Sequence, residues 1–243
     1  RLKNQQEKLI INERHEAWGS LARKLAHEIK NPLTPIQLTI DRLKTKYSSE
    51  LSENNSQNFK ENLKIINNQI KQIEKLVNEF SDFARMPKPI LSKNNLVDII
   101  DDNINLLKEL DNSITLNFKK QSDKIYLESD KEQINRVFLN LIKNSIESII
   151  QKSENNSNFA KNITIELTEN DSHISAIIED TGVGFESFEK NIKDILNPYF
   201  TTKKNGTGLG LSIVNKIIND HNGKIEFIKI DNGAKIKLEF IKQ

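Results

Sequence analysis

The 243-residue chain lacks cysteine, long hydrophobic runs and any large excess of charge of one sign. The absence of cysteine excludes disulfides, thiolate metal sites and a cysteine nucleophile. No apolar run exceeds three residues, whereas a membrane span needs about 18, so we expect a soluble chain that meets a membrane only through preceding segments. The 36 Lys and Arg against 34 Asp and Glu give a formal charge of +2, far from the basic excess of a duplex-binding surface. We therefore expect no nucleic-acid partner.

The length allows one large domain or two modest ones, at roughly 100–200 residues per domain. The chain begins with Arg1 and its one methionine is Met86, so we expect a fragment of a longer protein. The pattern of apolar residues differs between the two halves, which favours two domains.

The first half has the pattern of two long helices. Between about residues 12 and 47, apolar residues recur at spacings of three and four, which is typical of one face of a helix. The polar stretch 48–57 predicts a turn. From Phe59 to Ala84 the spacings alternate strictly between four and three, the heptad pattern of a coiled-coil seam. We predict an antiparallel helical hairpin that pairs with a second copy into a four-helix bundle, because a lone hairpin leaves apolar surface exposed.

The second half mixes helical and strand patterns. Two prolines within Met86–Pro89 end the second helix, and we expect a domain boundary there. Beyond it the patterns predict an α+β fold. The expected elements are a helix at 96–110, strands at 114–119 and 125–128, a helix at 130–150, strands at 163–167 and 174–178, a helix after Gly210, and a hairpin of strands at 225–230 and 234–241.

His27 is the first candidate for chemistry. It lies nine residues after Trp18, which at about 100° per residue places it opposite the apolar stripe. Glu28 is adjacent, Asn31 lies one turn on, and Pro32 removes a helix hydrogen bond nearby. A lone helical histidine is most often a solvated surface residue. An exposed imidazole beside a carboxylate suits a nucleophile, however, because the carboxylate can accept one ring proton and leave the other nitrogen free to attack.

Two glycine-rich segments favour a nucleotide. The segment 206–211, Gly-Thr-Gly-Leu-Gly-Leu, precedes a helical run at 212–220, so its free N–H groups can hold phosphates at a helix N-terminus. The segment 180–184, Asp-Thr-Gly-Val-Gly, follows a strand and places a carboxylate where glycines permit the approach of a flat ring. Each alone is also compatible with an ordinary turn.

A pair of asparagines completes this set. Asn140 and Asn144 stand one turn apart on a predicted helix, and carboxamide oxygens can ligate Mg²⁺, which bridges to nucleotide phosphates. Alone they are compatible with helix-surface polarity. Together with the glycine segments, in this order, they predict an ATP–Mg²⁺ site.

Five segments now resemble a known family. His27–Leu33, His-Glu-Ile-Lys-Asn-Pro-Leu, is similar to the phosphoacceptor motif of bacterial sensor histidine kinases. The segments that resemble the family's nucleotide-site boxes, in the family's order, are 140–144, 180–184, 198–203 and 206–211. The extensions 33–38 and 80–89 are most similar to nitrogen-regulation sensor kinases of the NtrY type. Two departures are Ser145, where alanine is common, and His221-Asn222-Gly223, in place of His-Gly-Gly.

The resemblance implies the fold and domain organisation. It implies an all-α dimeric helical hairpin, a four-helix bundle, followed by an α+β two-layer sandwich ATP-binding domain of the GHKL type. The expected parts are a signal-transmitting helix from a missing sensor region (1–14), a dimerisation and histidine phosphotransfer domain (15–86), a linker (87–92) and a catalytic ATP-binding domain (93–243). The segment Arg1–Glu16 is equally compatible with a frayed terminus.

The resemblance also implies a reaction. His27 receives the γ-phosphoryl group of ATP, Glu28 is its acid–base partner, and Asn31 is needed for phosphatase activity toward the partner. The phosphoryl group then passes to an aspartate in the receiver domain of a response regulator. The expected chain is thus the cytoplasmic portion of an inner-membrane sensor kinase, acting as a homodimer.

The nucleotide residues follow from the same resemblance. Asn144, with Asn140, holds Mg²⁺, Asp180 accepts from the adenine amino group, and Lys203 contacts the γ-phosphate. The residues that line or close over the nucleotide are Gly182, Gly184, Phe200, Thr202, Lys203, Gly206, Thr207, Gly208, Leu209 and Gly210.

Two other functions stay open on the sequence. A nucleotide-binding scaffold or phosphatase-biased protein would bind ATP and transfer little phosphate, but the intact Asn140, Asn144 and Asp180 count against it. A chaperone, mismatch-repair or topoisomerase ATPase would share the nucleotide-site fold. Such proteins lack the His27–Leu33 helix, and Asn140 replaces the glutamate that activates water in them.

Overall fold

The computed structural model describes residues 2–47, 53–84, 86–109, 111–155, 158–185, 195–203 and 206–242, with side chains from Leu25 in the first helix and from Gln57 in the second. Most of the turn predicted at 48–57 lies outside the described residues. The chain divides into two compact units. The first unit comprises Arg1–Pro87 and Lys203–Leu209, and the second comprises Lys88–Thr202 and Gly210–Gln243.

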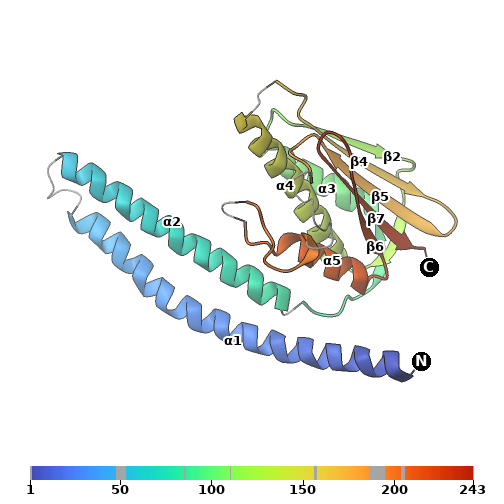
Figure 1. Cartoon of the computed structure of the whole chain (residues 1–243), viewed down its shortest axis with the longest axis horizontal. Helices are drawn as coiled ribbons and strands as arrows, with labels where there is room; N and C mark the ends of the chain where they lie inside the picture. Colours follow the sequence, from blue (N-terminus) through green and yellow to red (C-terminus); the bar gives the residue numbers. More distant parts are fainter. Residues whose placement is uncertain are drawn as a thin grey trace. The chain divides into compact units, whose positions relative to one another are not determined.

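The first unit is built on a helical hairpin. Helix α1 spans Leu2–Tyr47, and α2 spans Glu53–Ala84 and runs antiparallel to it (Figure 1). Ile40 of α1 packs with Leu63 and Ile70 of α2 as a small buried cluster. The seven-residue step from Leu63 to Ile70 is the heptad spacing predicted for the seam. The partly buried residues packed against the cluster are Leu33, Leu43 and Phe59.

The second unit is a sheet covered by helices. Its five-stranded sheet has the order β2-β4-β5-β7-β6, with β2 and β4 parallel and every other pair antiparallel. The strands are β2 (Thr115–Lys120), β4 (Asn162–Glu169), β5 (His173–Asp180), β6 (Lys224–Ile228) and β7 (Ala234–Ile241). The helices, which lie on one side of this sheet in Figure 1, are α3 (Leu96–Lys108), α4 (Lys131–Asn155) and α5 (Gly210–Asp220).

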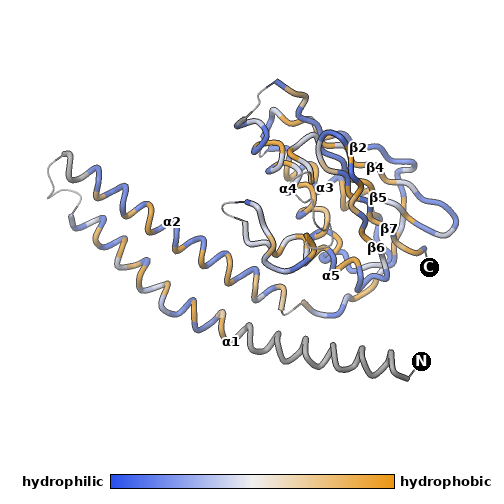
Figure 2. Tube along the Cα trace, viewed as in Figure 1, coloured by the Kyte–Doolittle hydropathy of each residue, from blue (hydrophilic) through white to orange (hydrophobic). Residues whose placement is uncertain are grey.

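The core of the second unit lies between sheet and helices. Alternate residues of the central strands are buried, as the period of two requires when one face is covered. They meet the apolar side of α4, where Phe138 and Ile142 are fully buried. Figure 2 shows hydrophobic positions along α4 and the central strands. The opposite face of the sheet is polar, and Lys235 of β7 pairs with Glu179 of β5 at 2.9 Å. The predicted order, a helical part followed by an α+β layered part, is confirmed.

The strand predicted at 125–128 is present, but the short strand that pairs with it was not predicted from the sequence. Strand β1 (Ser92–Asn95) pairs antiparallel with β3 (Tyr126–Ser129) as a separate two-stranded sheet. The sequence Ser-Lys-Asn-Asn contains no β-branched or aromatic residue, so the usual strand signal is absent. Side-chain amides support the pairing instead: Asn94 Nδ2 donates to the Ser129 carbonyl oxygen at 2.7 Å.

Candidate functional site

His27 lies on an exposed stretch of α1. The side chains of His27, Glu28 and Asn31 are exposed, whereas the neighbouring Ala26 is buried. Because residues 27, 28 and 31 fall within about one helical turn, they occupy one region of the helix surface. This arrangement leaves the imidazole open to a second molecule or a moving domain, with a carboxylate on the next residue.

The helix is unusual just after His27. Pro32 and Pro35 both lie inside α1. A proline has no N–H group, so the carbonyl four residues earlier loses its helical partner. The two carbonyls concerned belong to Glu28 and Asn31. The prolines therefore leave two carbonyls close to the exposed imidazole without their usual helical donor.

The second candidate region lies along α4. Asn140 Nδ2 donates to the Arg136 carbonyl oxygen at 2.8 Å, which fixes the amide and turns its Oδ1 away from the backbone. A Cβ on Gly210, the first residue of α5, would lie 3.2 Å from Asn140 Oδ1 and 3.9 Å from Asn144 Nδ2. The structure thus brings both asparagines against the glycine at the start of α5.

Asp180 ends strand β5 and is buried, with 4% of its surface exposed. Its Oδ1 accepts from the Gly182 N–H at 2.9 Å and from the Ala234 N–H at 3.3 Å. Burial raises the pKa of Asp180 above its ordinary value of 3.8, and three hydrogen bonds, one from the Ser145 side chain, oppose the rise. Donors from the following turn, from α4 and from the start of β7 therefore fix the carboxylate in place.

The turn after Asp180 requires its glycines. A Cβ on Gly182 would lie 2.2 Å from Ser148 Oγ. Gly184 has a φ of +70°, and a Cβ there would lie 2.4 Å from the Gly233 carbonyl oxygen. Ser148 Oγ also accepts from the Val183 N–H at 3.0 Å. The turn is thus pressed against α4 and the β6–β7 connection, with no room for side chains at 182 and 184.

The remaining predicted nucleotide residues divide between the units. Phe200 and Thr202 are exposed at the end of the described segment 195–202 of the second unit. Lys203–Leu209, which includes Gly206, Thr207 and Gly208, belongs to the first unit, where the Thr207 hydroxyl donates to a Glu79 carboxylate oxygen. The structure therefore assembles Asn140, Asn144, Asp180, Gly182, Gly184 and Gly210 within the second unit and places Lys203–Leu209 with α2.

Several supporting residues were missed from the sequence. Ser148 and Lys152 continue the four-residue spacing of Asn140 and Asn144, so a polar stripe along α4 was the available signal. For Gly233 the sequence predicts only a place in the connection between the strands at 225–230 and 234–241. Its φ is +100°, and a Cβ there would lie 1.7 Å from the Asp180 carbonyl oxygen. Its closeness to Asp180 is a long-range contact that no local pattern reveals.

The site fits a hard cation held through a bound ligand. Among the residues that the structure describes, no group of three or more His, Cys, Asp and Glu side chains could hold a metal ion. The candidate ligands are the side-chain amides of Asn140, whose Oδ1 faces the space that Gly210 leaves open, and of Asn144, whose Nδ2 lies on the same side. Oxygen donors suit Mg²⁺, which in such sites takes most of its ligands from phosphates and water.

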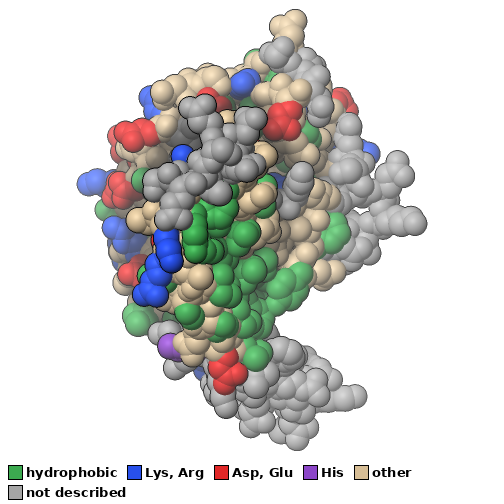
Figure 3. All heavy atoms as spheres, turned by 90° about the vertical axis from the view of Figure 1, so that its left-hand side faces the viewer, with side chains coloured by type: hydrophobic (Ala, Val, Ile, Leu, Met, Phe, Trp, Pro, Cys, Tyr) green, Lys and Arg blue, Asp and Glu red, His purple; other side chains and the backbone are tan. Residues whose placement is uncertain are grey.

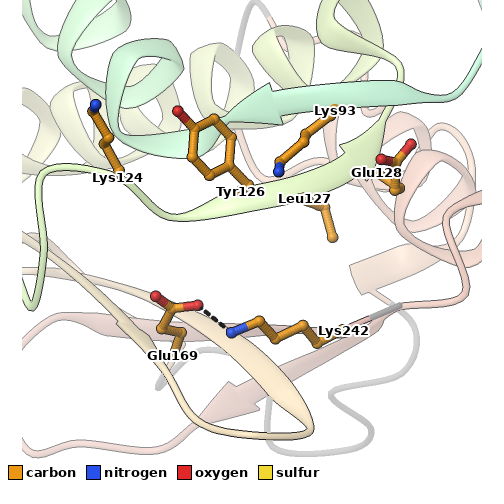
Figure 4. A pocket seen from close by; sticks show the side chains of 7 residues that line it. All are labelled: Lys93, Lys124, Tyr126, Leu127, Glu128, Glu169 and Lys242. Atoms are coloured by element: carbon orange, nitrogen blue, oxygen red, sulfur yellow. Dashed lines mark hydrogen bonds and ion pairs between the residues drawn. The ribbon is translucent and has the colours of Figure 1, made fainter.

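A pocket of about 340 Å³ lies elsewhere in the second unit. Figure 4 shows it between the β1–β3 pair and the end of the larger sheet, where Lys242 Nζ and Glu169 Oε2 are 2.6 Å apart. Its lining residues are Lys93, Lys124, Tyr126, Leu127, Glu128, Glu169 and Lys242. Glu169 pairs with Ile174 at the start of β5, whereas Asp180 ends that strand, so about 20 Å separates the two sites.

Comparisons with known proteins agree with this division. Residues 17–89 match the His Kinase A (phospho-acceptor) domain, and residues 129–243 match the histidine kinase-, DNA gyrase B- and HSP90-like ATPase. The chain is 38% identical over 240 residues to a putative NtrY-like sensor histidine kinase of Rickettsia prowazekii (strain Madrid E), covering 98% of this chain and 38% of that protein. It is 34% identical over 218 residues to nitrogen regulation protein NtrY of Azorhizobium caulinodans, covering 90% of this chain and 28% of that protein.

A solved structure shares both parts of the chain. The complex of histidine kinase ThkA with response regulator protein TrrA matches with a TM-score of 0.66 and 25% identity, covering 99% of this chain and 66% of that chain. The chain spans well under half the length of the curated relatives it matches. With a phospho-acceptor domain followed by a kinase-type ATPase domain, the chain belongs to the sensor histidine kinase family.

Proposed function

We propose that this chain transfers the γ-phosphoryl group of ATP to His27 and then to an aspartate in the receiver domain of a response regulator. The observation that carries the proposal is an exposed histidine beside a carboxylate, in a chain that also holds a buried acceptor and an asparagine pair. The response-regulator complex of ThkA supports the class of partner. The resemblance to NtrY-type kinases supports a role in nitrogen regulation.

The transfer makes one bond and breaks one. A ring nitrogen of His27 forms a bond to the γ-phosphorus, the bond to the bridging oxygen of ATP breaks, and ADP leaves. Glu28 accepts the ring proton, which keeps the attacking nitrogen nucleophilic. In a separate reaction, Asn31 would orient a water molecule that attacks the phosphoaspartate of the response regulator, releasing inorganic phosphate and the free aspartate.

We propose that the nucleotide binds to residues of the second unit and of the glycine-rich segment 206–211. Asp180 already has three protein donors, and a carboxylate has about four acceptor positions. The remaining capacity suits the exocyclic amino group of adenine, with Gly182 and Gly184 against the ring. Asn140 and Asn144 would hold Mg²⁺, which neutralises charge on the phosphates.

The remaining nucleotide contacts are proposed for residues 200–203 and for the glycine-rich segment 206–211. Lys203 would contact the γ-phosphate. The residues proposed to close over the nucleotide are Phe200, Thr202, Lys203, Gly206, Thr207, Gly208, Leu209 and Gly210.

The first unit is proposed to act as a homodimer. Both of its helices keep large apolar side chains more than 40% exposed, among them Ile29 and Ile36 of α1 and Ile66 and Ile73 of α2. Figure 3 shows a band of hydrophobic side chains on one face of the molecule. A second copy that covers these residues completes a four-helix bundle.

The domain boundaries and the location follow from the same proposal. We assign 15–86 to dimerisation and phosphotransfer, 87–92 to the linker and 93–243 to catalysis, with 1–14 as the end of a signalling helix. Within the described helices, none combines the length and the hydrophobicity needed to cross a membrane. The location proposed for this part is the cytoplasmic side of an inner-membrane sensor kinase, whose membrane spans lie in other segments.

Labelled ATP tests the proposed reaction. The chain is incubated with γ-labelled ATP and Mg²⁺ beside His27→Gln, and the stability of the label in acid and alkali is compared. Label that is acid-labile, alkali-stable and absent from His27→Gln supports the proposal. Label that persists in His27→Gln, or nucleotide binding that never produces label, contradicts it. Addition of a receiver domain then tests the second transfer.

A further inference from the structure

Lys152 lies two turns beyond Asn144 on α4, outside every segment that resembles the family's motifs. Its Nζ donates to the carbonyl oxygens of Thr181 at 2.8 Å and Gly182 at 3.1 Å. The same ammonium lies 4.8 Å from the centroid of the Phe159 ring. A half-buried lysine is thus aimed at the backbone of the turn that follows Asp180.

These bonds complete the polar contacts of the turn. The Gly182 N–H donates to Asp180 Oδ1, and the Val183 N–H donates to Ser148 Oγ. With Lys152 on the Thr181 and Gly182 carbonyls, two successive N–H groups and two successive C=O groups are each held by a side chain. Because the peptide planes of a turn rotate as units, fixing both kinds of group fixes the turn.

The ammonium also links a neighbouring segment to the turn. Phe159 lies beside Ala160, whose carbonyl oxygen accepts from the Thr181 hydroxyl at 2.7 Å. The Asn162 N–H in turn donates to Thr181 Oγ1 at 3.0 Å. Lys152 therefore sits where α4, the segment before β4 and the end of β5 meet. Two charge-assisted hydrogen bonds and a cation–π contact are stronger than neutral contacts of the same number.

We propose that Lys152 is a positioning residue that holds the turn after Asp180 in the conformation that receives the base of the nucleotide. The inference rests on the proposed function of Asp180 as acceptor for the base amino group. Lys152 acts through the turn, which presents Gly182 to Asp180 and to the ring. Its positive charge also favours the ionised carboxylate of Asp180, against the effect of burial.

This role predicts a loss confined to base recognition. Inosine triphosphate has the phosphates of ATP but a carbonyl oxygen in place of the amino group. Lys152→Met should weaken ATP binding about tenfold, as expected for one or two charge-assisted hydrogen bonds, and change inosine triphosphate binding by less than about twofold. Lys152→Arg, which keeps charge and donors, should restore most of the preference for ATP. Lys131→Met removes an exposed lysine from the first turn of α4 and should leave both affinities unchanged.

The experiment measures the dissociation constants of ATP and inosine triphosphate for the whole chain and the three variants by calorimetry, with thermal unfolding of each variant without nucleotide. A fall in the ATP to inosine triphosphate ratio in Lys152→Met, with recovery in Lys152→Arg, supports the inference. Equal weakening of both nucleotides, or an unchanged ratio, overturns it while the proposed function stands. A wild-type chain that does not prefer ATP overturns the proposed role of Asp180 and the inference with it.

Discussion

The helical unit and the sheet unit treat their polar groups in opposite ways. In the first, His27, Glu28 and Asn31 are exposed on a helix whose two prolines remove the usual donors of two carbonyls. In the second, Asp180 is buried and held by donors from several segments. The contrast indicates a division of labour: one unit presents a group that must reach other molecules, and the other keeps a rigid acceptor ready for a ligand.

The largest expected effect is on the stability of the sheet unit. Gly233→Ala places a Cβ 1.7 Å from the Asp180 carbonyl oxygen at a φ of +100°. Steric overlap and backbone strain should lower the free energy of unfolding by about 3 kcal/mol or more. Asn232→Ala, at the exposed neighbouring position, should change it by less than about 0.5 kcal/mol. Urea unfolding of both variants measures the two free energies of unfolding. Similar values would show that Gly233 does not lie against the Asp180 carbonyl oxygen.

The buried Asp180 should contribute more to ATP binding than an exposed carboxylate does. Asp180→Ala removes the partner of the Gly182 and Ala234 N–H groups and the proposed partner of the base. We expect ATP binding to weaken about 10- to 100-fold. Asp171→Ala, which alters an exposed aspartate two residues before β5, is the matched control and should bind ATP normally. Calorimetry on both variants measures the difference, and equal affinities would contradict the assignment.

The pH dependence of Asp180 should have two opposite signs. Its pKa is raised in the folded chain, so its contribution to stability is complete below the ordinary value of 3.8 and is lost as pH rises through the folded value. ATP binding needs the ionised form and should weaken as pH falls through that same raised value. Asp180→Asn, which does not titrate, should lose both trends. Chemical unfolding and ATP binding across the acidic range test this, and identical profiles for the two proteins would refute it.

A smaller effect is expected on the exposed apolar face of the hairpin. Ile66→Glu places a charge in the proposed dimer interface and should raise the dimer dissociation constant about tenfold or more. Leu106→Glu alters a residue of the second unit that is 65% exposed and should leave dimerisation unchanged. Sedimentation equilibrium distinguishes them. If both variants associate like the wild type, the dimer uses another surface.

The smallest effect is expected on the polar face of the sheet. Lys235 and Glu179 form an ion pair at 2.9 Å, with both side chains partly exposed. Such pairs contribute little, so Lys235→Ala should lower the free energy of unfolding by less than about 1 kcal/mol. Nucleotide binding should stay unchanged, because Lys235 lies on the face away from the helices. A large loss of stability in urea would show that this face is not solvated as described.

Local patterns predicted much of the fold and part of the candidate site. Regular spacing of apolar residues indicated both long helices, and alternation indicated the central strands, because each buries one face. Strand β1 could not be predicted because its four residues are polar and its pairing depends on Asn94 and Ser129, which are far apart in sequence.

The residues that support the site could not be identified from the sequence for a similar reason. Lys152 and Gly233 are recognisable only when the end of β5 lies beside both α4 and the β6–β7 connection. The motif residues could be found because their types and spacing are distinctive. The residues that hold the motifs in place act through long-range contacts, which a single sequence does not display.

The proposed function depends most directly on which residue of the chain receives phosphate. The chain is incubated with ATP and Mg²⁺, digested at alkaline pH, where phosphohistidine survives, and mapped by mass spectrometry. We expect one phosphate, on His27, and at low ATP concentration about 10- to 100-fold slower phosphorylation of Asp180→Ala than of the wild type. Phosphate on His15 or another residue, or phosphorylation of Asp180→Ala at the wild-type rate under those conditions, would contradict the proposed function.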